Sequence, residues 1–248
     1  MERHYLSGLT IRHVIMSRGR SNRVTTHKLV PQATLVVPET EVEAYRPLGL
    51  EIVPIPPDRI GVSAVRNWIV RRFDEEAVVM FDDDVTACRA LAGLSNRYIS
   101  PEEVAAMVEN TAYCCAGAGA RLFGWNQRPD PRVIARNDPF SVFNWVGGVV
   151  GVIGKEVRWD ELLKFKCDID CCLTELMNNR IIWHEKRFCF VQKRDKNLGG
   201  NSIFRSPERI AAEKRYLQKK WKAHITIDTY QSQDKVKMNV ERRQRVEL

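Results

Sequence analysis

The sequence predicts an α/β fold in which a mostly parallel sheet carries helices on both faces. Three observations support this class. Short apolar runs alternate with stretches of helical periodicity through the first half of the chain. One run, residues 77–81, is apolar at every position, as expected of a strand covered on both faces. The 248 residues, 44% of them apolar, suffice to bury the core of one large domain.

Four strands are expected in the first third of the chain, at residues 13–17, 33–37, 51–55 and 77–81. The first strand ends in a polar turn, and prolines close the second and third. A short helix at residues 41–48 and a longer one from Ser63 to Phe73 lie between them, with Ser63 as the expected cap.

The later elements are mainly helices, and capping residues indicate where they begin. Ser100, Pro101 and Glu103 form a capping pattern for a helix to about Cys115. Strand-like segments broken by glycines follow at residues 140–153, and Asp168 is the expected cap of another helix. A last helix, rich in Lys and Arg, is expected from Pro207 to about Ala223, with Ser206-Pro207-Glu208 at its start and Ser206 in the cap position.

Cysteine usage and hydropathy indicate a soluble cytoplasmic protein. The seven cysteines are odd in number and include two adjacent pairs, which argues against a disulfide framework. The most apolar stretch, residues 142–154, is too short to span a bilayer. The first sixteen residues carry charges where a secretory signal has its apolar run. We therefore expect one domain over residues 1–248 and no membrane association.

The net charge of +8 gathers at the end of the chain. Residues 186–248 hold 17 Lys and Arg against 7 Asp and Glu, whereas the rest has a net charge of −2. A basic segment of this kind attracts polyanions, nucleic acid above all. A solvated helix face that aids solubility is the alternative, and charge alone slightly favours it.

The sharpest feature is the triplet Asp82-Asp83-Asp84, directly after the apolar run at 77–81. Three adjacent carboxylates repel one another and contribute nothing to packing. At the carboxyl end of a parallel strand they lie where open α/β sheets bind ligands. Hard oxygen ligands suit Mg²⁺ or Mn²⁺ together with a diphosphate. The alternative is an acidic loop that contains a helix cap.

Two further segments accompany the triplet. The first strand ends in Ser17-Arg18-Gly19-Arg20, a basic turn suited to phosphate contacts. Arg66-Asn67 lies early in the helix that precedes the acidic strand. Taken singly, an exposed basic turn and a solvent-facing Arg66 explain these residues as well.

In this order the elements resemble the GT-A glycosyltransferases, with MFDDD in the place of their DxD motif, over residues 13–190. The resemblance implies that Asp82 contacts the ribose or the metal, that Asp84 binds the metal, and that Asp83 supports them. It also implies nucleotide contacts by a set of N-terminal residues: Ser17, Arg18, Arg20, Arg66 and Asn67.

The second half extends the resemblance. These enzymes often open a helix with a Glu-Asp pair that supplies the base, and the matching string here is Cys167-Asp168-Ile169-Asp170, with Cys167 in place of Glu. Asp168 is the first choice for the general base and Asp170 the second, although a helix cap explains an Asp there equally well. Gly147 and Gly148 are expected to floor the sugar and acceptor site, with a β-bulge as the alternative.

The motifs resemble those of a narrower group, the TET-associated glycosyltransferases of bacteriophages. The strings that carry this resemblance are IMSRGR, VRNWIV, VVMFDDD and the NLGG string before the basic helix. That resemblance implies a hexosyl- or N-acetylhexosaminyl-transferase that moves a sugar from a UDP-sugar to 5-hydroxymethylcytosine in phage DNA, in the cytoplasm of a bacterial host. The NLGG string would form a loop over the diphosphate. Candidate DNA contacts are Arg205, Arg209, Lys219, Lys220 and Lys222, with Trp221 as a stacking residue or a core anchor.

Three other functions remain open from the sequence. A glycosyltransferase acting on a glycan, protein or lipid would share the donor site. A nucleotidyltransferase shares the parallel sheet and the paired carboxylates, but it releases pyrophosphate. A non-catalytic DNA-binding module on the same fold would bind DNA without turning over a nucleotide-sugar.

Overall fold

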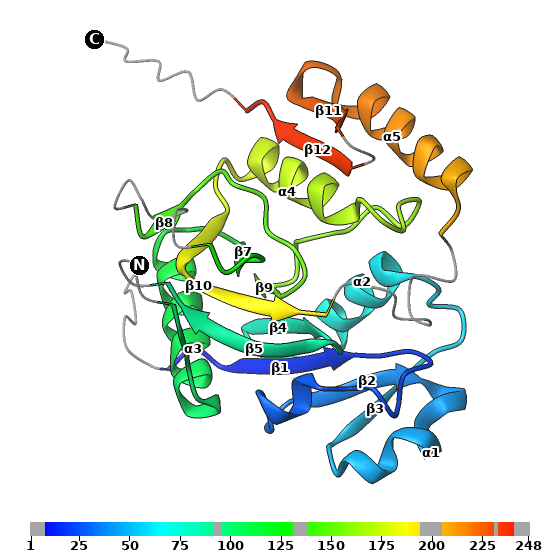
Figure 1. Ribbon diagram of the computed structural model, residues 1–248, viewed down its shortest axis with the longest axis vertical. Coiled ribbons are helices and arrows are strands. Elements are labelled where there is room, and N and C mark those ends of the chain that lie inside the picture. Colours follow the sequence, from blue (N-terminus) through cyan, green and yellow to red (C-terminus); the bar gives the residue numbers. More distant parts are fainter. Residues whose placement is uncertain (1–7, 92–95, 131–137, 194–204, 231–232, 241–248) are drawn as a thin grey trace.

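The computed structural model describes residues 8–91, 96–130, 138–193, 205–230 and 233–240. Within these ranges the core is a ten-stranded sheet in the order β3-β2-β1-β4-β9-β7-β10-β5-β6, with β8 paired to β10 (Figure 1). The strands span β1 Ile11–Met16, β2 Thr34–Pro38, β3 Ile52–Ile55, β4 Ala77–Asp82, β5 Val85–Ala90, β6 Arg97–Tyr98, β7 Leu122–Asn126, β8 Phe140–Ser141, β9 Val150–Ile153 and β10 Trp183–Gln192.

Strand direction divides the sheet. The four strands β3, β2, β1 and β4 are mutually parallel, and β10 runs parallel to β7. Strand β9 is antiparallel to both of its neighbours, and β5 is antiparallel to β10. The parallel strands therefore end at one edge of the sheet, which is where α/β sheets bind ligands. The predicted α/β class is confirmed.

Helices cover both faces of the sheet because the strand side chains alternate between two cores. Ile15 and Phe81 pack with α1 (Val42–Tyr45) and α3 (Pro101–Gly117) on one face. Val14 and Met80 pack with α2 (Val62–Arg72) and α4 (Cys167–Asn178) on the other. All four of these strand residues are buried. The strands are therefore covered on both faces, which explains why β4 is apolar from Ala77 to Phe81.

The C-terminal elements lie on the far side of α4 from the sheet (Figure 1). They are α5 (Pro207–Trp221) and a separate antiparallel pair, β11 (Ile225–Tyr230) with β12 (Gln233–Met238). Leu217 and Ile225 continue the core that contains α4. Short 3-10 turns occur at η1 Thr26–Lys28, η2 Glu39–Glu41, η3 Arg46–Leu48 and η6 Lys222–His224.

Two of the four predicted caps are confirmed. Ser100 forms the full capping box with Glu103, and the Ser206 side chain accepts from Arg209. Ser63 does not cap α2: Gly61 stands at that position, and the buried Ser63 hydroxyl donates to the Leu163 carbonyl at 2.7 Å. Asp168 does not cap α4 either, because the helix begins at Cys167 after Lys166.

The cysteines behave as small buried side chains. All seven are free thiols, and six of them are buried. Burial raises the pKa of the Cys167 thiol to about 12, with the Asp168 carboxylate adding to the effect. The Cys167 thiol therefore stays protonated near neutral pH, and the six buried thiols pack the core.

Candidate active site

A cavity of about 690 Å³ opens at the carboxyl ends of the parallel strands. Met16, Pro38, Ile55 and Asp82, one from the end of each of β1 to β4, lie along its floor. The opposite wall comes from the segment that leads into α4 and from its first turn. Its charged lining includes the carboxylates Asp82, Asp83, Asp84 and Asp168 and the cations Arg18, Arg20, Arg59, Arg66, Lys164, Lys166 and Arg205. Carboxylates and cations so mixed suit a metal–diphosphate ligand.

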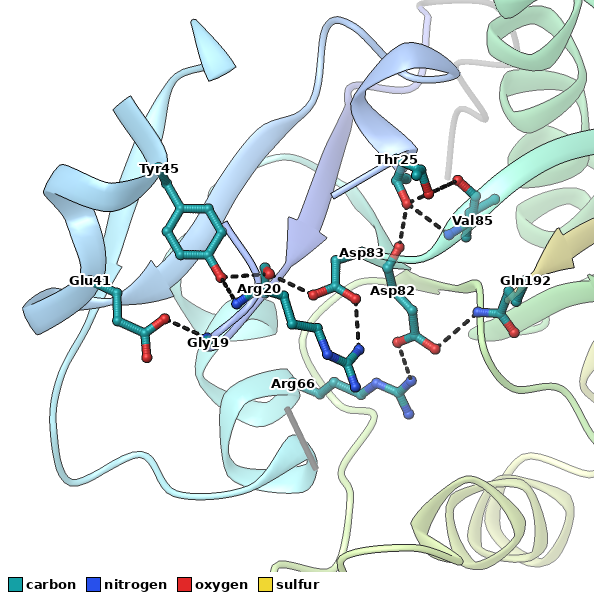
Figure 2. Close-up of polar contacts among 12 residues, drawn as sticks. Gly19, Arg20, Thr25, Glu41, Tyr45, Arg66, Asp82, Asp83, Val85 and Gln192 are labelled. Atoms are coloured by element: carbon teal, nitrogen blue, oxygen red, sulfur yellow. Dashed lines mark hydrogen bonds and ion pairs between the residues drawn. The ribbon is translucent and has the colours of Figure 1, made fainter. Parts of the chain in front are cut away.

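Asp83 locks the first strand to the acidic turn. Its carboxylate accepts from the Ser17 hydroxyl at 2.5 Å and pairs with Arg20 Nη1 at 2.9 Å, and only 4% of the residue is exposed. Tyr45 completes the group, because its hydroxyl lies 2.8 Å from the Ser17 Oγ and accepts from the Arg20 amide (Figure 2). The side chain of Asp83 thus holds the end of β1 against the acidic turn.

Two threonines hold the backbone of the acidic turn. The Thr26 hydroxyl donates to the Asp82 carbonyl at 2.6 Å, and the Thr25 amide donates to the Asp83 carbonyl at 2.9 Å. The Val85 amide returns a bond to Thr26 Oγ1 at 3.0 Å. These polar contacts fix the directions of the three carboxylates. Sequence reasoning missed them, since the threonines lie about sixty residues upstream.

Asp82 is the carboxylate presented to the cavity. Its Oδ2 accepts from Gln192 Nε2 at 3.0 Å, and its Oδ1 lies 4.0 Å from Arg66 Nη2 (Figure 2). Burial within the site raises the pKa of Asp82 to about 7; Arg66 opposes the shift, and the nearby carboxylates of Asp84 and Asp168 reinforce it. Gln192, at the end of β10, carried no signal in the sequence.

Arg66 joins the two sides of the cavity. It is 2% exposed, it forms an ion pair with Asp168, and its guanidinium stacks 5.6 Å from the Trp159 ring centroid. Burial disfavours its charge, but Asp168, Cys167 and Asp82 outweigh that cost, so the pKa of Arg66 is raised. The solvent-facing Arg66 considered above is therefore wrong: the side chain is an internal cation between Asp82 and Asp168.

Asp168 lies in the first turn of α4, beside the consecutive glycines Gly147 and Gly148. A Cβ on Gly147 would stand 2.9 Å from Asp168 Oδ2 and 3.0 Å from the Trp145 ring, and one on Gly148 would stand 2.7 Å from Gln192 Oε1. Gly148 also has φ +73°, a conformation that favours glycine. The two glycines therefore allow the carboxylate, the indole and the Gln192 amide to converge on one side of the cavity.

The carboxylates around Asp82 are candidate ligands of a divalent cation. Among the described residues, no group of three or more His, Cys, Asp or Glu side chains is arranged to hold a metal ion by itself. Asp82 nevertheless has a raised pKa caused in part by Asp84, Asp168 and Asp83, which a divalent cation would relieve. One or two carboxylates completed by diphosphate oxygens are the usual set for Mg²⁺, so the residues fit such a cation.

Three predicted site residues, Asn67, Gly147 and Asp170, are not among the residues that line the cavity. The Asn67 amide donates to the Trp159 carbonyl at 2.8 Å and to Glu161 at 2.9 Å, while its oxygen accepts from the Trp159 amide. Asp170 is 1% exposed and binds Lys220 and Trp221 of α5. Asn67 as a nucleotide contact and Asp170 as a base are therefore corrected: both hold neighbouring segments in place.

The predicted DNA contacts separate into three groups. Arg205 lines the cavity, where it stacks over the Phe165 ring at 5.4 Å. Lys219 and Lys222 are exposed at the end of α5. Arg209 pairs with Glu213 at 3.6 Å, and Lys220 pairs with Asp160 at 2.9 Å and with Asp170. Trp221 is the anchor considered above, since its indole donates to Asp170 at 2.7 Å.

The NLGG string at residues 197–200 falls outside the described residues. None of the helices in the described ranges is long and apolar enough to cross a bilayer.

A family model described as TET-Associated Glycosyltransferase matches residues 11–200. A search of curated protein sequences returns no match. Among solved structures, the chain resembles glucosyl-3-phosphoglycerate synthase from Mycobacterium tuberculosis in complex with Mn²⁺, UDP and phosphoglyceric acid. The TM-score is 0.54 at 14% identity, over 93% of this chain and 87% of that one. The same synthase with Mg²⁺ and UDP gives the same TM-score at 12% identity and equal coverage.

A second enzyme, the mannosyltransferase PcManGT from Pyrobaculum calidifontis with GDP-Man and Mn²⁺, aligns at TM-score 0.54 and 12% identity over 75% of this chain. This chain spans 58% of that neighbour's length. At such low identity these likenesses establish the fold, and the expected GT-A architecture is confirmed.

Proposed function

The chain belongs to the TET-associated glycosyltransferase family, and from this premise we propose that it moves a sugar from a UDP-sugar to a hydroxyl group with the help of Mn²⁺ or Mg²⁺. The proposed acceptor is 5-hydroxymethylcytosine in DNA. The observation that carries the proposal is the cavity lined by Asp82, Asp84 and Asp168, in which the buried Arg66 lies between Asp82 and Asp168.

The donor half of the cavity would hold a nucleoside diphosphate. Arg18 is exposed at the end of β1, and Arg20 lines the same wall against Asp83. Both are placed to contact phosphate oxygens, and Asp82 and Asp84 would hold the cation. When bound, that cation neutralises the charge that develops on the diphosphate as it leaves. The names of the structural neighbours, which bind UDP or GDP-Man with Mn²⁺, support this assignment.

Asp168 would receive the acceptor proton if the reaction inverts the anomeric carbon. The acceptor oxygen attacks that carbon, the bond to the diphosphate oxygen breaks, and the hydroxyl proton passes to the carboxylate. Arg66 orients the carboxylate through its ion pair, and Trp145 and the two glycines border the space in front of it. This chain's residues thus supply orientation and a proton acceptor, while the leaving group keeps the bonding electrons.

The DNA acceptor rests on the family resemblance and on charge. The segment 186–248 holds the excess of positive charge, and Arg215, Lys219 and Lys222 are exposed along α5. Arg205, just before α5, lines the cavity itself. A duplex phosphate backbone held along the helix would therefore lead toward Asp168. The proposed organisation is one domain over residues 1–248, acting in the cytoplasm of a bacterial host.

The test is mass spectrometry of nucleosides after incubation with Mn²⁺, pooled UDP-sugars and DNA that contains 5-hydroxymethylcytosine, with unmodified DNA as the control. A hexose or N-acetylhexosamine mass on the modified base alone is expected. Asp84→Ala should abolish turnover while the circular dichroism spectrum stays unchanged. Full activity of that variant would refute the metal assignment. UDP release without DNA modification would refute the acceptor.

A further inference from the structure

Glu213 is a carboxylate buried where a basic helix was expected to face solvent. It lies in the middle of α5 and is 4% exposed. Its two oxygens accept from three consecutive backbone amides: Lys164 at 2.8 Å, Phe165 at 3.0 Å and Lys166 at 3.3 Å. A carboxylate that binds three successive N–H groups fixes the backbone of that segment, because each bond restrains one peptide plane.

The segment that Glu213 binds leads directly into the proposed base. Residues 164–169 line the cavity, and α4 begins at Cys167 without a side-chain cap from Lys166. Asp168 is thus two residues beyond the last amide that Glu213 restrains. The Ser63 hydroxyl fixes the preceding Leu163 carbonyl at 2.7 Å, so the turn is held from both α2 and α5.

The inner face of α5 makes a second set of contacts just past Asp168. Lys220 Nζ binds both oxygens of Asp170, at 2.8 and 2.9 Å, and Trp221 Nε1 binds Oδ1 at 2.7 Å. The helix therefore restrains the chain on each side of Asp168. Displacement of the turn by a fraction of an ångström would shift Asp168 against Arg66.

We propose that Glu213 is a positioning residue for sugar transfer: its carboxylate sets the 164–166 backbone and, through it, the place of Asp168. This inference rests on the proposed function. Glutamine at 213 keeps the shape but turns an NH₂ group toward amide donors, so at least one of the three bonds is lost. A misplacement of about 1 Å can cost on the order of 100-fold in rate. We expect kcat to fall by about 10- to 100-fold.

The donor half of the cavity lies on β1 and β4, which Glu213 does not contact. The Kd for UDP in the presence of Mn²⁺ should therefore stay within about 2-fold of the parent value in Glu213→Gln, with one binding site per chain. Glu208→Gln is the matched control, because Glu208 lies on the same helix and is exposed. That control should leave kcat, the UDP Kd and the melting temperature close to those of the parent protein.

Coupling between the two carboxylates is the decisive readout. The four proteins are the parent, Glu213→Gln, Asp168→Asn and the double variant, each assayed for sugar transfer to hydroxymethylated DNA well below its melting temperature. If Glu213 acts through Asp168, its substitution should cost less than about 3-fold in the Asp168→Asn background. Full additivity of the two losses would overturn the positioning role.

Other outcomes are equally informative. An unchanged kcat in Glu213→Gln overturns the inference, and so does a loss of UDP-binding stoichiometry that matches the loss of rate, which would indicate unfolded protein. A parent protein that transfers no sugar overturns the proposed function itself, and the inference with it. A lower kcat at full stoichiometry and unchanged UDP Kd, coupled to Asp168, supports the positioning role.

Discussion

The substitution Asp170→Asn distinguishes the roles of Asp168 and Asp170, the two carboxylates in the first turn of α4. Asp170 is 1% exposed and bonds to Lys220 and Trp221, whereas Asp168 lines the cavity and pairs with Arg66. We therefore expect Asp170→Asn to destabilise the fold and to leave turnover nearly unchanged. Asp168→Asn, two residues away on the same helix, should remove turnover.

The cost of Asp170→Asn follows from the contacts. The amide oxygen of Asn still accepts from Trp221, but Lys220 loses a charged partner 2.8 Å away. Removing one member of a buried ion pair costs about 3–5 kcal/mol. Lys220 keeps Asp160 at 2.9 Å and is 31% exposed, which places the loss nearer 2–3 kcal/mol, since hydrogen bonds to charged groups are worth about 1.5–3 kcal/mol. For a chain of this size the melting temperature should fall by roughly 5–10 °C.

The assay combines urea denaturation with steady-state transfer, and kcat is expressed per mole of UDP-binding protein. Asp170→Asn should retain kcat within about 3-fold, because Trp221 still binds the amide oxygen and keeps the chain beyond Asp168 in place. Asp168→Asn should lose about 100-fold or more, as expected when a general base is removed. It should also lose some stability, because the buried Arg66 would be left with a neutral partner.

Two results would refute this reasoning. A 100-fold loss of kcat in fully folded Asp170→Asn would make that carboxylate part of the reaction. An unchanged free energy of unfolding in the same variant would show that the ion pair with Lys220 contributes nothing to the stability of the fold.

Further predictions concern charge and pH. The double substitution Lys219→Gln and Lys222→Gln should weaken DNA binding and reduce the slope of log K against log salt by about 2, with the free energy of unfolding unchanged. Equal slopes would mean that these lysines contribute to solubility and not to DNA binding. Lys220→Gln should instead lower the melting temperature, since Lys220 is paired within the fold. Burial lowers the pKa of His184 to about 4 from 6.5. The unfolded chain therefore binds a proton below pH 6.5 that the folded chain refuses until about pH 4, so stability falls as the pH falls through that window, by up to about 3 kcal/mol. Denaturation at pH 7, 6 and 5 checks this, and His184→Phe should reduce the dependence but not remove it, because burial lowers the pKa of His13 to about 4 as well.

Local patterns predicted much of the architecture. Alternating strands and helices, the capping box at Ser100 and the cap at Ser206 are properties of short segments, and their physical causes lie within a few residues. The place of the acidic triplet was predicted in the same way. A strand that is apolar at every position is typical of a parallel sheet covered on both faces, and residues that follow it lie at the carboxyl ends of the strands. The antiparallel insertion of β9 beside β7, and the parallel pairing of β7 with β10, depend on contacts between distant segments, and most of these strands carried no clear local signal.

Side-chain direction could not be read from the sequence. Asp168 and Asp170 are two positions apart on a helix and point roughly 200° apart, so one reaches the cavity and the other faces α5. Which one faces the cavity depends on where α4 packs. Arg66 and Asn67 separate for the same reason: Arg66 reaches Asp168, and Asn67 holds Trp159.

Composition, periodicity and motif order are properties of the chain alone, and they were enough to predict the fold class, the family resemblance and the segments that carry charge. Which charges meet depends on how the folded chain packs. Glu213, Gln192 and Tyr45 come from α5, β10 and α1, and each touches a residue of the candidate site or the segment leading into it from far along the chain. Contacts between distant segments arise only when the sheet and helices pack, so no local pattern encodes them.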